Sequence, residues 1–148
     1  MIHRFASVFV LPVLFASTLT TGQIASAPQP NPVLYLARTE SVVTRGKRYI
    51  RYRYDVAYKD AYPAEMFAPA PQLPPCGANR KASRTRVDIY GQNGKRLYGF
   101  CDLARPSDLG HIWFILRQGV NPPSYVYIEL TDRQTGIKYK SNLADTTL

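Results

Sequence analysis

Cys76 and Cys101 are the only two cysteines in this 148-residue chain, and they bracket a single short segment. On the chain-entropy model, a disulfide that closes a loop of this size stabilises a fold by about 3 kcal/mol. The competing interpretation is a reactive or metal-binding pair, but the spacing is not C-x-x-C and no further cysteine or histidine joins the two. We therefore predict a structural disulfide between Cys76 and Cys101, and neither a metal site nor a cofactor.

The sequence between the cysteines is typical of a β-hairpin. Asn93-Gly94 is the strongest short hairpin signal in the chain, because both residues tolerate positive φ. The flanking stretches RTRVDIY and RLYGF pair as strands when the turn lies at this dipeptide. This pairing places four side chains on one core-facing side, with Val87 opposite Phe100 and Ile89 opposite Tyr98.

A long proline-rich loop, residues 60–83, precedes the hairpin. Proline cannot donate to a strand ladder, so this stretch is not a central strand. A structureless loop of this length is uncommon unless it is functional or fastened to the fold, and the predicted disulfide would fasten it. Within the loop, YPAEMF is expected to form one short helical turn that places Met66 and Phe67 in the core.

Two further stretches read as strands. RYIRYRYDVAY alternates with a period of two, so the even-numbered residues of 50–58 point to one face and Tyr49, Arg51 and Arg53 point to the other. HIWFILR is apolar on both faces, which is typical of a central strand covered on both sides.

The end of the chain, PPSYVYIELTDRQTGIKYKSN, reads as two strands joined at RQTG. Its first strand has an inward row of apolar residues: Val126, Ile128 and Leu130. This segment resembles the final hairpin of immunoglobulin-like and fibronectin-III-like domains. The Cys-Trp-Cys order of true immunoglobulin domains is not met, because Trp113 follows both cysteines.

Turn signals separate about seven short strands, and no stretch has a convincing long-helix pattern. This pattern predicts an all-β fold, a single antiparallel and immunoglobulin-like β-sandwich with one long proline-rich loop. The stretch PPCGANRKASRTRVDIYGQNGKRLYGFC is similar to small exported bacterial proteins of unknown role. That resemblance implies no activity.

The N-terminus indicates export. An uncharged apolar run, FASVFVLPVLFASTLTT, is followed by Ala25 and Ala27 in the A-x-A pattern of a signal-peptidase site, and an uncleaved anchor is the alternative. No second apolar run is long enough to span a bilayer. We expect a secreted or periplasmic protein with four parts: a secretory signal peptide (1–27), a proline-rich lead-in (28–32), the β-sandwich domain (33–143) and a frayed tail (144–148).

Few residues could support catalysis. Beyond the predicted signal peptide, His111 is the only histidine. A hydrolase would need it beside Ser107 and either Asp108 or Asp102, and no nucleophile motif supports that arrangement. The acidic residues are sparse and scattered, and nothing in their spacing indicates a carboxylate pair for acid–base work. We therefore expect no enzyme activity.

The balance of charge and aromatic residues suggests a binding surface instead. The chain has 19 Lys and Arg against 10 Asp and Glu, a net charge of +9, and 11 tyrosines. Flat rings interleaved with arginine can stack on ring-containing ligands while the charges meet phosphates or carboxylates. The candidate binding residues are Tyr49, Arg51 and Arg53, joined by Arg84 and Arg86 if their strands share a sheet. The alternative is that these side chains only form the solvated face of a sheet.

The sequence thus favours an exported, non-catalytic binding module that contacts an anionic or glycan-like envelope partner through this Tyr/Arg face. An anionic polysaccharide or another exported protein fits such a face, and nucleic acid is less favoured outside the cell. Two alternatives stay open. One is a small inhibitor or accessory protein that docks another exported protein through loop 60–83, and the other is a purely structural envelope protein.

Overall fold

The alternating stretch around Tyr49–Ala57 belongs to a three-stranded antiparallel sheet in the computed structural model, which describes residues 29–147. The strands are β1 (Val33–Thr44), β2 (Lys47–Ala57) and β5 (Ile112–Arg117), in the order β1-β2-β5. Arg45 and Gly46, at φ of 51° and 72°, make the tight turn between β1 and β2. The predicted signal peptide, residues 1–27, lies outside the described residues.

The predicted hairpin lies in a second, five-stranded antiparallel sheet. Its strands run in the order β4-β3-β6-β7, with β8 also paired to β6. The strand bounds are β3 (Thr85–Gly91), β4 (Arg96–Phe100), β6 (Tyr125–Asp132), β7 (Lys138–Lys140) and β8 (Ala144–Asp145). The predicted register is confirmed, because Val87 pairs with Phe100 and Ile89 with Tyr98.

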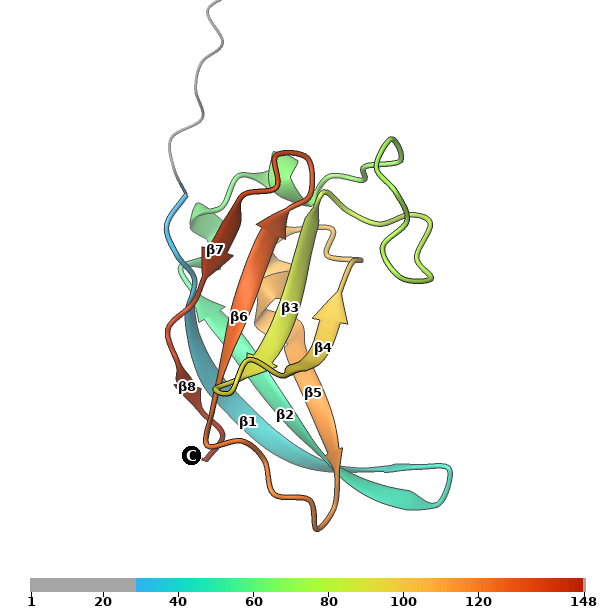
Figure 1. Cartoon of the computed structure of the whole chain (residues 1–148), viewed down its shortest axis with the longest axis vertical. Coiled ribbons are helices and arrows are strands. Elements are labelled where there is room, and N and C mark those ends of the chain that lie inside the picture. The colour runs from blue at the N-terminus through green and yellow to red at the C-terminus, as the bar shows by residue number, and fades with distance from the viewer. Residues whose placement is uncertain (1–28, 148) are drawn as a thin grey trace, which may run out of the picture.

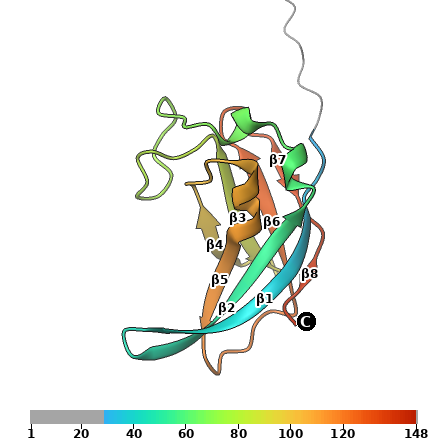
Figure 2. The ribbon, with the colours of Figure 1, turned by 180° about the vertical axis from the view of Figure 1, so that it is seen from behind.

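The two sheets pack face to face, with the five-stranded sheet toward the viewer in Figure 1 and the three-stranded sheet toward the viewer in Figure 2. Their facing side chains form the core: Leu34, Tyr52, Tyr54, Val56, Val87, Ile89, Ile112, Phe114, Val126, Ile128 and Leu130. The Tyr52 and Phe114 rings stack within it, with centroids 4.9 Å apart. The all-β sandwich predicted from the sequence is confirmed. The β1–β2 hairpin projects beyond the ends of the other strands in both views.

Two expectations about the three-stranded sheet are wrong, one about Tyr58 and one about the position of β5. Tyr58 does not continue the inward row of β2, because the strand ends at Ala57 and Tyr58 turns out of it at φ 56°, leaving its side chain 84 % exposed. β5 is an edge strand and not a central one, since β2 is its only neighbour in the sheet. The outward ring of Trp113 on β5 is covered by Tyr98 and Phe100 from β4 of the other sheet.

The C-terminal residues are also better fixed than a frayed tail would be. Ala144 lies in β8, is buried and pairs with Val126 of β6. Thr146 is buried as well, and its hydroxyl donates a hydrogen bond of 2.7 Å to the carbonyl of Pro123. Backbone pairing and a side-chain hydrogen bond therefore hold this segment against β6.

The proline-rich loop is irregular but anchored. It includes the short 3₁₀ turns η1 (Lys59–Ala61) and η2 (Ala64–Phe67), and η2 buries Met66 and Phe67 as predicted. A third such turn, η3 (Pro106–His111), precedes β5. The predicted disulfide between Cys76 and Cys101 is present, with the Cα atoms 5.8 Å apart.

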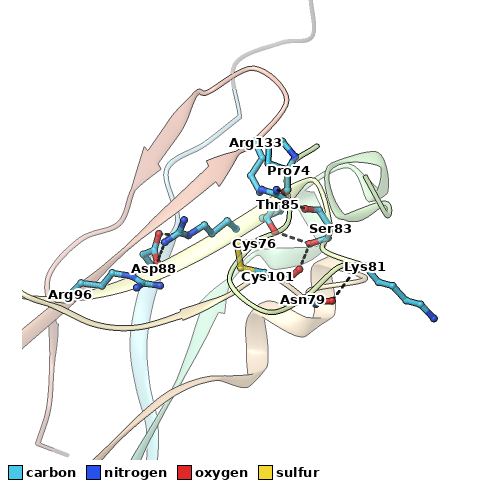
Figure 3. The surroundings of a disulfide bond; sticks show 11 residues. Pro74, Cys76, Asn79, Lys81, Ser83, Thr85, Asp88, Arg96, Cys101 and Arg133 are labelled. Atoms are coloured by element: carbon cyan, nitrogen blue, oxygen red, sulfur yellow. Dashed lines mark hydrogen bonds and ion pairs between the residues drawn. A yellow bond between two sulfur atoms is a disulfide. The ribbon is translucent and has the colours of Figure 1, made fainter. Parts of the chain in front are cut away.

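Hydrogen bonds beside the disulfide fasten the loop further, as Figure 3 shows. The Ser83 amide donates to the Cys101 carbonyl at 2.9 Å. The Thr85 hydroxyl donates to the Met66 carbonyl at 2.5 Å. Arg133 donates to the carbonyls of both Ser83 and Pro74.

Within residues 29–147, no helix has the length and apolar character needed to cross a membrane.

Candidate binding site

The outer face of the three-stranded sheet is rich in cations and aromatic rings. Tyr49, Arg51 and Arg53 alternate on β2 with the buried core residues, so the structure brings these three predicted site residues together. The strand registers place further side chains beside them from β1 and β5. We define the cationic face by these residues: Arg38, Lys47, Tyr49, Arg51, Arg53, Trp113 and Arg117.

A carboxylate lies within the cationic face and is shared by two arginines. Glu40 accepts a hydrogen bond of 2.6 Å from Arg53 Nε and one of 3.0 Å from Arg51 Nη1. The hydrogen bond from Arg53 is the main reason that the pKa of Glu40 lies below its usual range. A single carboxylate cannot neutralise two guanidinium groups, and no ion pair is found for Arg38, Lys47 or Arg117 among the described residues. The face therefore keeps a clear excess of positive charge.

Trp113 connects the cationic face to the other sheet. The Arg51 guanidinium carbon lies 5.0 Å from the centroid of the Trp113 ring, within the range of a cation–π contact. The Tyr98 ring of β4 lies 4.8 Å from the same ring at an interplanar angle of 30°. Trp113 was not among the residues predicted for the site, because only the pairing of β2 with β5 brings it next to Arg53.

Arg84 and Arg86 do not join the cationic face, because β2 and β3 lie in different sheets. Arg84 instead makes two hydrogen bonds to the buried carboxylate of Asp132, from Nε to Oδ1 at 2.7 Å and from Nη2 to Oδ2 at 2.5 Å. These bonds are the main reason that the pKa of Asp132 is lowered to about 2. Arg84 therefore secures the start of β3 to the end of β6.

Arg86 lines a groove beside the disulfide. The groove has a volume of about 520 Å³ and is lined by β4 and by the loop that follows Cys76. Aromatic rings, two arginines and the disulfide line it: Cys76, Gly77, Ala78, Asn79, Arg86, Arg96, Tyr98, Gly99, Phe100, Cys101, Asp102 and Trp113. Trp113 is thus common to this groove and to the cationic face.

Of the residues that a hydrolase would need, the structure brings Asp102, Asp108 and His111 to one hollow, whose lining does not include Ser107. This hollow has a volume of about 290 Å³ and lies beside Trp113. The Asp108 carboxylate accepts the backbone N–H groups of Ala104 and Arg105, at 2.8 and 2.9 Å, and so caps η3. In the described part of the chain, no hydrogen bond joins His111 to Ser107 or to an acidic side chain. Nor do three His, Cys, Asp or Glu side chains of residues 29–147 gather as metal ligands would.

Comparison with known proteins gives no family. No protein-family model matches the chain, and no curated protein matches it significantly. A crystal structure of the human pre-T cell receptor aligns with a TM-score of 0.40 and 13% sequence identity, covering 77% of this chain and 97% of the receptor chain. That match is too distant to bear on function. The candidate site consequently stands on the geometry of the chain itself, a cationic face and a groove that share Trp113.

Proposed function

We propose that this protein is an exported binding module that contacts an anionic polymer through the cationic face. The observation that carries the proposal is the composition of that face. It has five cations, of which Arg51 and Arg53 share Glu40, and the others are Arg38, Lys47 and Arg117. Tyr49 and Trp113 add flat rings between these charges.

The spread of the charges favours a polymer over a small anion. A single exposed ion pair contributes little in water and is screened by salt within about 8 Å at physiological ionic strength. The cations of the face lie on three adjacent strands, so an extended chain of carboxylates, sulfates or phosphates would meet several of them at once. Simultaneous contacts raise the overall affinity well above that of any one contact.

The proposed compartment agrees with the chemistry. A disulfide such as Cys76–Cys101 is typical of proteins that fold in an oxidising environment. Together with the predicted signal peptide, it supports a secreted or periplasmic protein. Acidic polysaccharide is an abundant anionic polymer outside the cytoplasm, whereas nucleic acid is mostly inside it, so polysaccharide is the favoured partner.

The test is retention of the purified, oxidised protein on immobilised polygalacturonate, polyglutamate and DNA at low and at physiological salt. The double variant Arg51→Ala, Arg53→Ala should lose the retention that survives physiological salt. The matched control is Arg80→Ala, Lys81→Ala, which removes the same charge from exposed positions in the proline-rich loop. We expect this control to be retained like the wild type.

Two outcomes would contradict the proposal. If retention on every polymer disappears at physiological salt, the positive charge acts without a specific site. If the loop control loses retention and the Arg51, Arg53 variant does not, the contact surface is the disulfide-linked loop 60–83. That second result would support the docking role considered from the sequence.

A further inference from the structure

We propose that the groove beside the disulfide is a subsite for one sugar ring, which makes the polymer an acidic polysaccharide. This inference rests on the proposed function, because the same polymer would extend from the cationic face across Trp113 into the groove. It adds Arg96 and also Tyr98, which the hairpin pattern predicted to face the core but which is 40 % exposed.

One wall of the groove is aromatic. Tyr98 packs between its neighbours, with its ring centroid 4.8 Å from that of Trp113 and 5.0 Å from that of Phe100. Tyr98 nevertheless stays 40 % exposed and lines the groove. A flat ring fixed by its neighbours and open to solvent can pack against the apolar C–H face of a sugar ring, at little cost in side-chain entropy.

The lining also has a polar part, two arginines that a buried carboxylate holds in place. Asp88, which is 5 % exposed, binds both Arg96, at 2.5 Å from Nε to Oδ1, and Arg86, at 2.8 Å from Nε to Oδ2. Figure 3 shows Asp88 and Arg96 on the side of β3 and β4 that carries the disulfide. Each guanidinium has five N–H donors, so donors beyond those bound to Asp88 remain for a ligand.

Gly99 allows this polar part to form. It lies opposite Asp88 in the β3–β4 pair and carries no side chain of its own. A Cβ atom at Gly99 would overlap the Arg96 guanidinium and would lie 2.5 Å from Asp88 Oδ1. The Arg96 side chain can therefore cross β4 and reach Asp88, which fixes the guanidinium beside the groove.

The charges in the groove balance, and this distinguishes it from the cationic face. The positive charges of Arg86 and Arg96 are balanced by two carboxylates. Asp88 pairs with both arginines, and Asp102 lines the groove. A site without excess charge does not select a ligand by its charge alone. An aromatic platform surrounded by fixed hydrogen-bond donors and a carboxylate acceptor instead matches a ring with apolar faces and a rim of hydroxyl groups. The volume of about 520 Å³ lies within the range of small-ligand sites.

The chain offers a direct probe of the groove, because Trp113 is its only tryptophan. Titration with trigalacturonate, monitored by Trp113 fluorescence at physiological salt, should give a saturable change. Tyr98→Ala should weaken this binding by about tenfold, since it removes the stacking platform. Tyr125→Ala is the matched control, because Tyr125 is also an exposed strand tyrosine but does not line the groove. Arg96→Gln, which keeps the aromatic wall, should also weaken binding and serves if Tyr98→Ala does not fold.

The outcomes separate the groove from the cationic face. If trigalacturonate leaves Trp113 fluorescence unchanged while the Arg51, Arg53 variant still loses retention on polymers, the groove inference fails and the proposed function stands. If the fluorescence change is lost in Arg51→Ala and kept in both groove variants, the sugar binds on the cationic face and the inference fails again. Saturable binding that depends on Tyr98 and Arg96, with polymer retention independent of Arg51 and Arg53, would support the groove and overturn the proposed function.

Discussion

The Arg84 guanidinium and the Asp132 carboxylate are joined by two parallel hydrogen bonds, of 2.7 and 2.5 Å. Asp132 is 4 % exposed and also accepts the hydroxyl of Thr135 at 2.8 Å and the amide of Gln134 at 3.0 Å. This one carboxylate therefore holds together the start of β3, the end of β6 and the turn that leads to β7.

The Asp132 carboxylate should make stability depend on pH in a defined range. The pKa of Asp132 in the folded protein is about 2, below the ordinary aspartate pKa near 4. The ionised carboxylate therefore contributes its full stabilisation at pH values above about 4. The stabilisation is lost as the pH falls from about 4 toward 2, and we expect about 2 kcal/mol to disappear in this range. Urea unfolding of the wild type at pH 6, 4 and 2 measures it.

Asp132→Asn should remove this part of the pH dependence and lower stability at pH 6. The matched control is Asp60→Asn, a change at an exposed aspartate, which should leave the wild-type profile intact. An Asp132→Asn protein whose stability falls with pH as steeply as that of the wild type would contradict the role assigned to this carboxylate.

Reduction of the disulfide should destabilise the fold without unfolding it. Closing the loop between Cys76 and Cys101, 25 residues apart, restricts the unfolded chain, and its loss should cost about 3 kcal/mol. Urea unfolding with and without reductant gives the difference. The double variant Cys76→Ser, Cys101→Ser should match the reduced wild type and should not respond to reductant. An unchanged midpoint after reduction would show that the loop hydrogen bonds alone are sufficient.

Gly99→Ala should destabilise the protein by about 1–3 kcal/mol, because the added Cβ atom displaces Arg96 and crowds Asp88. Urea unfolding measures this cost, and a double-mutant cycle identifies its source. In an Arg96→Ala background, the overlapping guanidinium is absent, so the same glycine change should cost less. An equal cost in both backgrounds would rule out Arg96 as the cause.

Glu40→Gln should strengthen binding to an anionic polymer. The change removes the carboxylate that Arg51 and Arg53 share, so both guanidinium groups become available to the ligand. Retention on polygalacturonate should then persist to higher salt than in the wild type. Glu65→Gln removes the same charge at an exposed position in η2 and serves as the control. If both variants shift retention equally, only net charge matters.

Local patterns in the sequence were sufficient for much of the fold. The pairs Val87–Phe100 and Ile89–Tyr98 match those predicted from the turn at Asn93-Gly94, although an irregularity beyond Ile89 shifts the register nearer the turn, where Tyr90 pairs with Arg96. The inward and outward faces of β2 follow from its alternation. The burial of Met66 and Phe67 follows from the contrast between these apolar residues and the prolines around them.

The relations between distant segments could not be predicted in this way. Alternation shows that β2 and β5 are strands but not that they are neighbours, so it does not place Trp113 beside Arg53. For the same reason the sequence left open whether Arg86 lies in the sheet of Arg51. The apolar pattern of β5 predicted a central strand covered on both sides, whereas β5 is an edge strand and side chains from β4 cover its outward Trp113.

The position of the disulfide has a consequence for oxidative folding. A chain with two cysteines has only one intramolecular disulfide isomer, so there is no wrong pairing to be reshuffled. Cys101 directly follows β4, and Cys76 lies in the loop just before β3. A hairpin closes within microseconds, whereas thiol oxidation takes seconds or longer. The bond can therefore form without waiting for the three-stranded sheet. Formation of this bond takes an oxidant, but it takes no disulfide isomerase.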